Sequence, residues 1–138
     1  MDPLARVRDL YAPMLEAAIV DSGVDRPTLE LCRRRLLHVL GRDTDDPSRA
    51  LADVDAGVLD DLRSWPTSPM FADRERALLT FTERLALDPA GAHDGEVVPV
   101  RDALGERGVV ALTVALGLLE GLERLPMTTT FRVEEDRP

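Results

Sequence analysis

Of the cysteine, histidine and lysine side chains that act as nucleophiles or bases near neutral pH, the chain has one cysteine, two histidines and no lysine. A single cysteine cannot form an intramolecular disulfide. Cys32 falls on an apolar helical stripe with Leu29 and Leu36. We therefore expect Cys32 to be a small buried hydrophobe rather than a catalytic thiol.

The two histidines are not spaced as metal ligands on one helix face, so the sequence predicts neither a metal site nor a cofactor. His93 lies in a segment rich in Gly and Asp and should be solvated. His38 follows Glu30 by eight residues, with Arg34 midway. This i, i+4, i+8 spacing could form an acid–base site, but we favour the alternative, a partly exposed helix face.

Two stretches resemble a known family. Residues 29–41 (LELCRRRLLHVLG) are similar to the helix that precedes the Cys-x-x-Cys pair in the carboxymuconolactone decarboxylase / alkylhydroperoxidase D-like family. Residues 65–77 (WPTSPMFADRERA) resemble the more specific W-x-x-S-P-x-F-x-x-x-E-R-A segment of that family. With the helical C-terminal part, the resemblance covers most of residues 20–126. We expect the second motif to pack a connector onto the core and to take no part in catalysis.

The resemblance implies a site from which the redox residues have been lost. Relatives use a glutamate, two thiols at the start of the next helix and a histidine that moves protons. Here Glu30 matches the glutamate, the thiol positions fall on Arg42 and Asp45, and the histidine position falls on Arg49. Arginine is neither a nucleophile nor an acid–base catalyst at neutral pH, so thiol chemistry cannot be inherited.

The charged set Arg42, Asp45 and Arg49 beside Glu30 has two interpretations. We favour a network of ion pairs and helix caps that fills the vacated pocket. The alternative is an anion-binding pocket, in which an arginine near a helix N-terminus holds a carboxylate. His38 is a further candidate for contact with such a ligand.

Three functions remain open. The first is a redox-inactive homo-oligomer that binds a small ligand, such as a carboxylate, or has a structural role. The second is a non-redox lyase or decarboxylase, with Glu30 as acid or base and Arg42 or Arg49 holding the substrate carboxylate. A peroxidase ranks last because the chain has no resolving thiol. The resemblance implies that the homo-oligomer is a trimer or a hexamer.

Composition restricts these functions further. A chain of 138 residues is expected to form one domain, residues 1–138. The net charge of −9 argues against a nucleic-acid surface. The longest apolar run, residues 109–119, is shorter than the roughly 20 residues that span a bilayer. The N-terminus lacks the features of a signal peptide, so we expect a cytoplasmic protein without membrane contact.

The apolar periodicity predicts an all-α bundle of about six helices, which the resemblance implies is of the alkylhydroperoxidase D-like type. Helices are expected at residues 4–20, 27–40, 47–54, 55–62, 73–87, 98–104 and 106–125. Pro13 should kink or divide the first helix. Caps are expected at Gly41, Asp45, Asp55 and Asp73. Residues 89–97 are expected to be a polar loop and residues 128–138 a loose tail.

The sequence also predicts that one segment, residues 109–119, is buried and that another, residues 33–35, is exposed. Residues 109–119 are apolar on nearly every side of a helix, so this helix should be buried within the domain or between subunits. Gly117 and Gly121 share one face of it and would let another helix approach closely. In contrast, the run Arg33–Arg35 is expected to be solvated, with one or two ion pairs.

Overall fold

The computed structural model describes residues 2–42 and 49–135, with side chains as far as Leu125. The described residues are helical or irregular and contain no strand, which confirms the all-α class. No helix among them is both long enough and apolar enough to cross a membrane.

Helix α1 runs from Pro3 to Ser22 and begins at Asp2, whose carboxylate accepts the Leu4 N–H at 3.0 Å. It ends at Gly23, which adopts a left-handed conformation with φ 70°. Of the two outcomes expected at Pro13, a kink or a division, the division does not occur, because α1 is continuous through this residue. Pro13 is exposed, so water can solvate the carbonyl that loses its helical partner there.

Helix α2 runs from Arg26 to Val39, with Asp25 as its N-cap and Gly41 at φ 74° just after its end. The cap expected at Asp45 lies outside the described residues. Residues 50–55 are not helical, so the helix expected at 47–54 is wrong where it can be checked. The Leu51 N–H instead bonds a side chain of α2, which holds this segment irregular. Asp55 caps α3 (Ala56–Asp61), as expected, and the 3₁₀ helix η2 (Leu62–Thr67) follows.

Helix α4 runs from Asp73 to Leu87, and its N-cap is Ala72 rather than the expected Asp73. The Glu75 carboxylate accepts the Ala72 N–H at 2.9 Å, which supplies the cap bond from within the first turn. Asp73 is thereby placed inside the helix, where its charge favours the positive end of the helix dipole.

Helix α5 runs from Asp94 to Glu135, after the short 3₁₀ helix η3 (Pro89–Gly91). The polar loop expected at 89–97 is therefore wrong, because helix begins at Asp94. Gly105 interrupts α5 with φ 75° and ψ 170°, which separates the expected helix at 98–104 from the long one that follows. The backbone of residues 128–135 is helical and not a loose tail. The β-propensity of the threonines there is a weak preference that an established helix can override.

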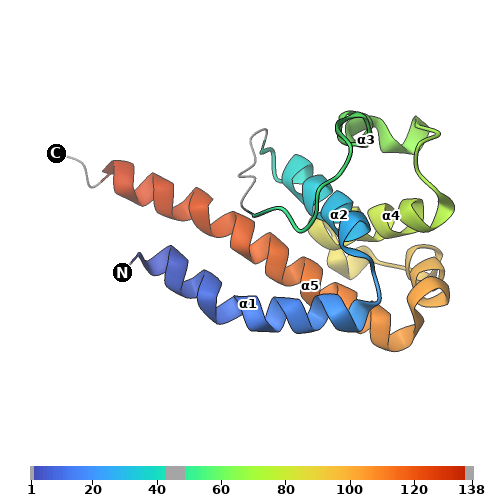
Figure 1. The fold of residues 1–138 in the computed structure, drawn as a ribbon, viewed down its shortest axis with the longest axis horizontal. Coiled ribbons are helices and arrows are strands. Elements are labelled where there is room, and N and C mark those ends of the chain that lie inside the picture. The colour runs from blue at the N-terminus through green and yellow to red at the C-terminus, as the bar shows by residue number, and fades with distance from the viewer. Residues whose placement is uncertain (1, 43–48, 136–138) are drawn as a thin grey trace.

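Helices α1 and α5 lie side by side and antiparallel, so the first turn of α1 and the last turn of α5 lie at the same end of the bundle (Figure 1). Helices α2 and α4 pack together against α5. The main core lies between these four helices and includes Ile19, Cys32, Leu78, Leu112 and Leu116. A second cluster joins the connector to the same helices. Its buried members are Leu31, Leu62, Trp65, Phe71 and Leu79.

The apolar helix over residues 109–119 is buried on one side only. Leu112 and Leu116 lie in the core, with exposed fractions of 0% and 2%. Val110 and Val114 are 65% and 43% exposed. Of the two alternatives expected for this helix, burial all round within the domain is wrong, since no described element covers its outer side, and burial between subunits stays a prediction.

Candidate functional site

Glu30 is buried at 1% exposure in the first helical turns of α2. Its Oε1 accepts hydrogen bonds from Arg33 Nε (2.7 Å) and from the Leu51 backbone N–H (3.0 Å). Its Oε2 accepts from Arg33 Nη2 (2.8 Å) and Arg34 Nε (3.2 Å). The carboxylate is thus held by a two-pronged guanidinium contact and two further donors, an arrangement that can stabilise a buried charge.

Glu123 on α5 is the second buried carboxylate of the site, at 4% exposure. Arg33 Nη1 lies 3.5 Å from Glu123 Oε1, so Arg33 joins the two glutamates. Arg49 Nη1 lies 3.2 Å from Glu123 Oε2. Arg42 Nη1 donates to the Glu123 carbonyl oxygen at 2.8 Å and lies 3.8 Å from Oε2. We call these residues, together with Arg34, the Glu30–Glu123 network.

The structure therefore places Arg42 and Arg49 on Glu123, whereas the sequence pointed to Glu30 as their neighbour. Asp45 lies outside the described residues. Arg33 is 1% exposed and central to the network, so its expected solvation is wrong. The i, i+3 spacing of Glu30 and Arg33 was a local signal of their ion pair. No local signal marked Glu123, which is 74 residues beyond Arg49 in the chain.

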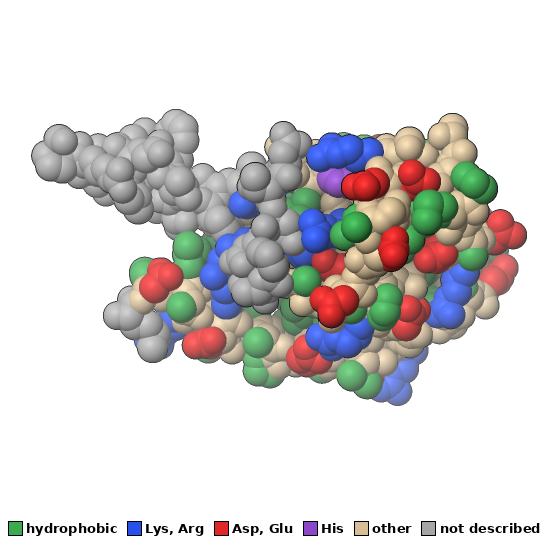
Figure 2. Space-filling view, turned by 45° about the horizontal axis from the view of Figure 1, so that its top comes forward, with side chains coloured by type: hydrophobic (Ala, Val, Ile, Leu, Met, Phe, Trp, Pro, Cys, Tyr) green, Lys and Arg blue, Asp and Glu red, His purple; other side chains and the backbone are tan. Residues whose placement is uncertain are grey.

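A pocket of about 220 Å³ adjoins the network. Arg8, Arg33, Arg49 and Glu123 form its polar lining. Its apolar walls are Ala12, Leu15, Leu51, Leu119 and Leu122. The lining contains three arginines and one glutamate, so its formal charge is positive although the net charge of the protein is −9. Figure 2 shows acidic side chains spread over the visible face, with groups of basic side chains between them.

Arg8, like Glu123, is a charged pocket residue that the sequence analysis did not single out. It is half-buried on α1, and no hydrogen bond or ion pair joins it to the residues that the structure describes. The other two arginines of the lining are already engaged with Glu123. Arg8 therefore presents a cation to the pocket without a carboxylate from the described part of the chain.

The two histidines have separate environments. His38 is half-buried near the end of α2, and Arg34, midway between it and Glu30, bonds the glutamate. His38 does not line the pocket beside Arg8. The His93 side chain is 66% exposed and lies 3.3 Å from Glu96. Among the described residues, no group of three or more potential ligands could hold a metal ion.

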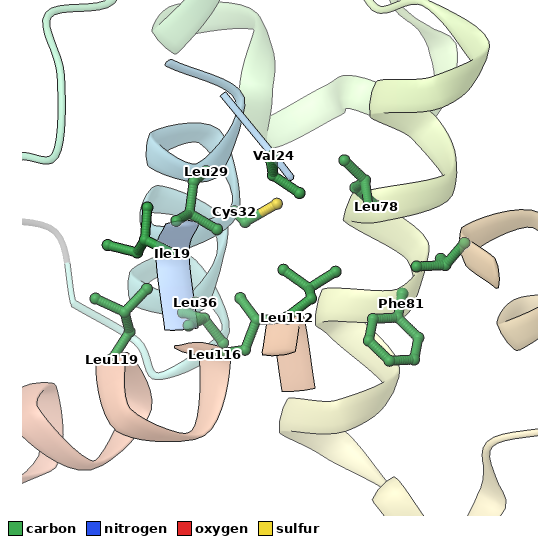
Figure 3. Close-up of a cluster of buried hydrophobic side chains, with 11 residues drawn as sticks. Ile19, Val24, Leu29, Cys32, Leu36, Leu78, Phe81, Leu112, Leu116 and Leu119 are labelled. Atoms are coloured by element: carbon green, nitrogen blue, oxygen red, sulfur yellow. The ribbon is translucent and has the colours of Figure 1, made fainter. Parts of the chain in front are cut away.

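Cys32 lies in the main core and is fully buried (Figure 3). Burial disfavours the thiolate and raises the pKa of Cys32 to about 11, although a hydrogen bond with Thr82 opposes the shift. A thiol of this kind is neither exposed nor ionised at neutral pH, so the expectation of a small buried hydrophobe is confirmed.

The motif at residues 65–77 forms a continuous set of contacts. Trp65 Nε1 donates to Glu83 Oε1 at 2.7 Å, and Ser68 Oγ donates to Asp61 Oδ2 at 2.8 Å. Arg76 donates to the backbone carbonyls of Phe71, Pro66 and Ser68. The predicted packing of the connector onto the core is confirmed.

Comparisons of the chain with protein-family models, with curated proteins and with solved structures gave no match.

Proposed function

We propose that this chain is a redox-inactive binding protein for a small carboxylate, held in the pocket beside the Glu30–Glu123 network. The observation that carries the proposal is the half-buried Arg8, which lines the pocket and has no ionic partner among the described residues. A guanidinium group matches a carboxylate in charge and in planar geometry. The leucine walls favour a ligand whose other end is apolar.

The pocket's size limits the ligand. A volume of 220 Å³ corresponds to about seven water molecules at about 30 Å³ each. This is below the roughly 300–1,000 Å³ of typical sites for drug-sized ligands. A carboxylate with a short aliphatic or single-ring body is the class that fits.

Within this proposal, the bundle is a divergent member of the carboxymuconolactone decarboxylase / alkylhydroperoxidase D-like family. The support is that Arg76 of the motif at residues 65–77 bonds the carbonyls of Pro66, Ser68 and Phe71 in the same motif, so these residues act as one structural unit. The resemblance implies a trimer or a hexamer, and of these two only the hexamer can contain the two-fold contact proposed below.

A lyase that uses Glu30 is the weaker alternative. Both Glu30 oxygens already accept two hydrogen bonds each, and Glu30 does not line the pocket. A carboxylate so occupied has no free lone pair directed toward a substrate, so the contacts favour a structural role for it. Peroxidase chemistry ranks last, because the buried Cys32 would have to supply the thiolate.

Calorimetric titration with benzoate tests the proposal. We expect a dissociation constant of about 0.1–1 mM for a ligand of this size. Benzyl alcohol, which has a similar shape without the charge, should bind at least about tenfold more weakly. Arg8→Gln should weaken benzoate binding by about tenfold, because it removes a charged hydrogen-bond donor.

Arg6→Gln is the matched control, because Arg6 is exposed on the same helix and does not line the pocket. It removes the same charge and should leave benzoate affinity within about twofold, as expected for a screened surface charge. Equal losses in the two variants would show that only the general charge of α1 matters and would refute the pocket.

A further inference from the structure

The outer face of the α1–α5 pair, on the side away from α2 and α4, is apolar and exposed. On α1, Leu10 is 68% exposed and Met14 54%. On α5, Val110 is 65% exposed and Val114 43%. An apolar face of this kind on a chain with 31% charged residues marks an interaction surface.

Two grooves run along this face. One, of about 470 Å³, lies between Met14 and Ala17 of α1 and Val110 and Val114 of α5. The other, of about 350 Å³, lies between Val7 and Tyr11 of α1 and Gly117 and Gly121 of α5. The first groove is walled by valines on α5 and the second by glycines.

The glycines of the second groove serve no packing need inside the chain. A Cβ added at Gly117 or at Gly121 would meet nothing within 4 Å. Glycine in the middle of a helix lowers its stability relative to alanine. Two exposed glycines on one helix face are therefore explained better by a close neighbour from outside the chain than by contacts within it.

The four exposed α5 positions form a stripe that is complementary to itself. Val110, Val114, Gly117 and Gly121 are spaced by four, three and four residues. If two copies of α5 pack antiparallel about a two-fold axis between residues 115 and 116, Val110 lies opposite Gly121 and Val114 opposite Gly117. Each valine then enters the space above a glycine, and the first groove of one copy faces the second groove of the other.

Charged residues at the ends of the stripe fit nearly the same register. Across this axis Leu125 falls opposite Glu106 and Arg107 opposite Arg124, so Glu106 and Arg124 are out of line by one residue, about 1.5 Å along the helix, on the same side of the stripe. Both side chains are accessible, at 86% and 58% exposure, although within the chain Glu106 lies 4.0 Å from Arg101 and Arg124 lies 2.6 Å from Glu120. The pairing brings a glutamate of one copy within side-chain reach of an arginine of the other at both ends of the contact, which adds charge complementarity to the apolar contact.

We propose that the outer face of α1 and α5 binds a second copy of this chain, in an antiparallel α5–α5 contact about a two-fold axis. A two-fold contact uses the same surface on both copies, as this stripe requires. The pair forms a four-helix layer in which both apolar grooves are covered.

The mass in solution, measured by light scattering across 1–100 µM, tests the pairing. At the upper concentrations we expect twice the chain mass of 15.2 kDa, or six times that mass if three such dimers form the hexamer that the resemblance implies. Gly117→Leu should weaken association by at least about tenfold, because the new side chain meets Val114 of the second copy. It should fold normally, since the space is open within the chain and leucine favours helix. Circular dichroism checks this.

Leu87→Ser is the control for loss of exposed apolar surface, because Leu87 is 70% exposed at the end of α4, away from this face. It should leave the mass unchanged. A monomer throughout the concentration range, a trimer, or a dimer that tolerates Gly117→Leu would each overturn the proposal.

A charge exchange tests the register. Glu106→Arg alone should weaken the dimer, because it places two arginines together at each end. Adding Arg124→Glu should restore association to within about threefold of the original, since the pairs are re-formed in reverse. If the double variant is as weak as the sum of the two single variants, the two residues do not face each other and the register is wrong.

Discussion

The Glu30 carboxylate is buried, and its two oxygens accept four hydrogen bonds from Arg33, Arg34 and the Leu51 backbone. Removing one partner from a buried ion pair is costly because the other charge stays buried without compensation. Glu30 therefore has a structural role: it connects α2 to the segment at Leu51 and, through Arg33, to Glu123 on α5.

Glu30→Gln should lower the free energy of unfolding by about 2–4 kcal/mol, because it leaves Arg33 without its main counter-charge. Chemical denaturation monitored by circular dichroism measures this. Glu16→Gln is a matched control, since Glu16 also receives two bonds from one arginine, Arg26, but on the surface. It should cost less than about 1 kcal/mol. Equal costs would contradict the importance given to burial.

Cys32 gives a pH dependence of stability. Its folded pKa of about 11 lies above that of an exposed thiol, so the folded state keeps the proton that the unfolded state loses. The buried thiol therefore makes its full contribution to the free energy of unfolding below about pH 8.5. As the pH rises toward 11, this free energy decreases by up to about 2–3 kcal/mol.

The measurement compares the chain with Cys32→Ala between pH 7 and 10.5. The difference in unfolding free energy between the two proteins should shrink as the pH rises. In the folded protein at pH 8, Cys32 should not react with a thiol reagent within minutes but should react at once in denaturant. Rapid reaction of the folded protein would show that the thiol is accessible.

Among the elements, the connector between α3 and α4 depends on one side chain. Arg76, in the first turn of α4, donates to three carbonyls of the connector, from Phe71, Pro66 and Ser68. The 3₁₀ helix η2 and the turn after it leave these carbonyls without helical partners. The planar, multiply donating guanidinium can satisfy all three, whereas an ammonium group cannot reach them together.

Arg76→Lys should therefore lower the unfolding free energy by about 1–3 kcal/mol despite keeping the charge. Arg74→Lys is the control on the same helix, because Arg74 is exposed and its bond to the Gly23 carbonyl is long, at 3.4 Å. That change should stay within about 0.5 kcal/mol. A cost for Arg76→Lys no greater than for Arg74→Lys would show that water satisfies the carbonyls equally well.

For the whole molecule, the two core clusters lie on the same two helices. On α2, Leu31 belongs to the connector cluster and its neighbour Cys32 to the main core. On α4, Leu79 and Leu78 divide in the same way. Because α2 and α4 contribute side chains to both clusters, displacing either helix disrupts both clusters together. The described bundle should therefore unfold as one unit.

The fluorescence of Trp65, the only tryptophan, reports on the connector, and far-ultraviolet circular dichroism reports on all helices. Both signals should give the same denaturation midpoint, within about 0.2 M urea. An earlier fluorescence transition would mean that the connector detaches before the bundle unfolds.

The sequence determined those features that depend on residues close together in the chain. The all-α class, the caps at Asp55 and Gly41 and the burial of Cys32 follow from local periodicity and cap chemistry, and the structure confirms them. Local signals also had limits: the polar composition of residues 89–97 predicts a loop, but a polar composition is also compatible with the helix that begins at Asp94.

Tertiary structure alone decided the partners of the charged residues and the side of α5 that remains uncovered. Periodicity shows that residues share a helix face, but it does not show which distant element lies against that face. Glu123 meets Arg33, Arg42 and Arg49 only because α5 returns beside α2. Arg8 likewise reaches the pocket because α1 lies along α5, and that same pairing leaves the outer face of the two helices exposed.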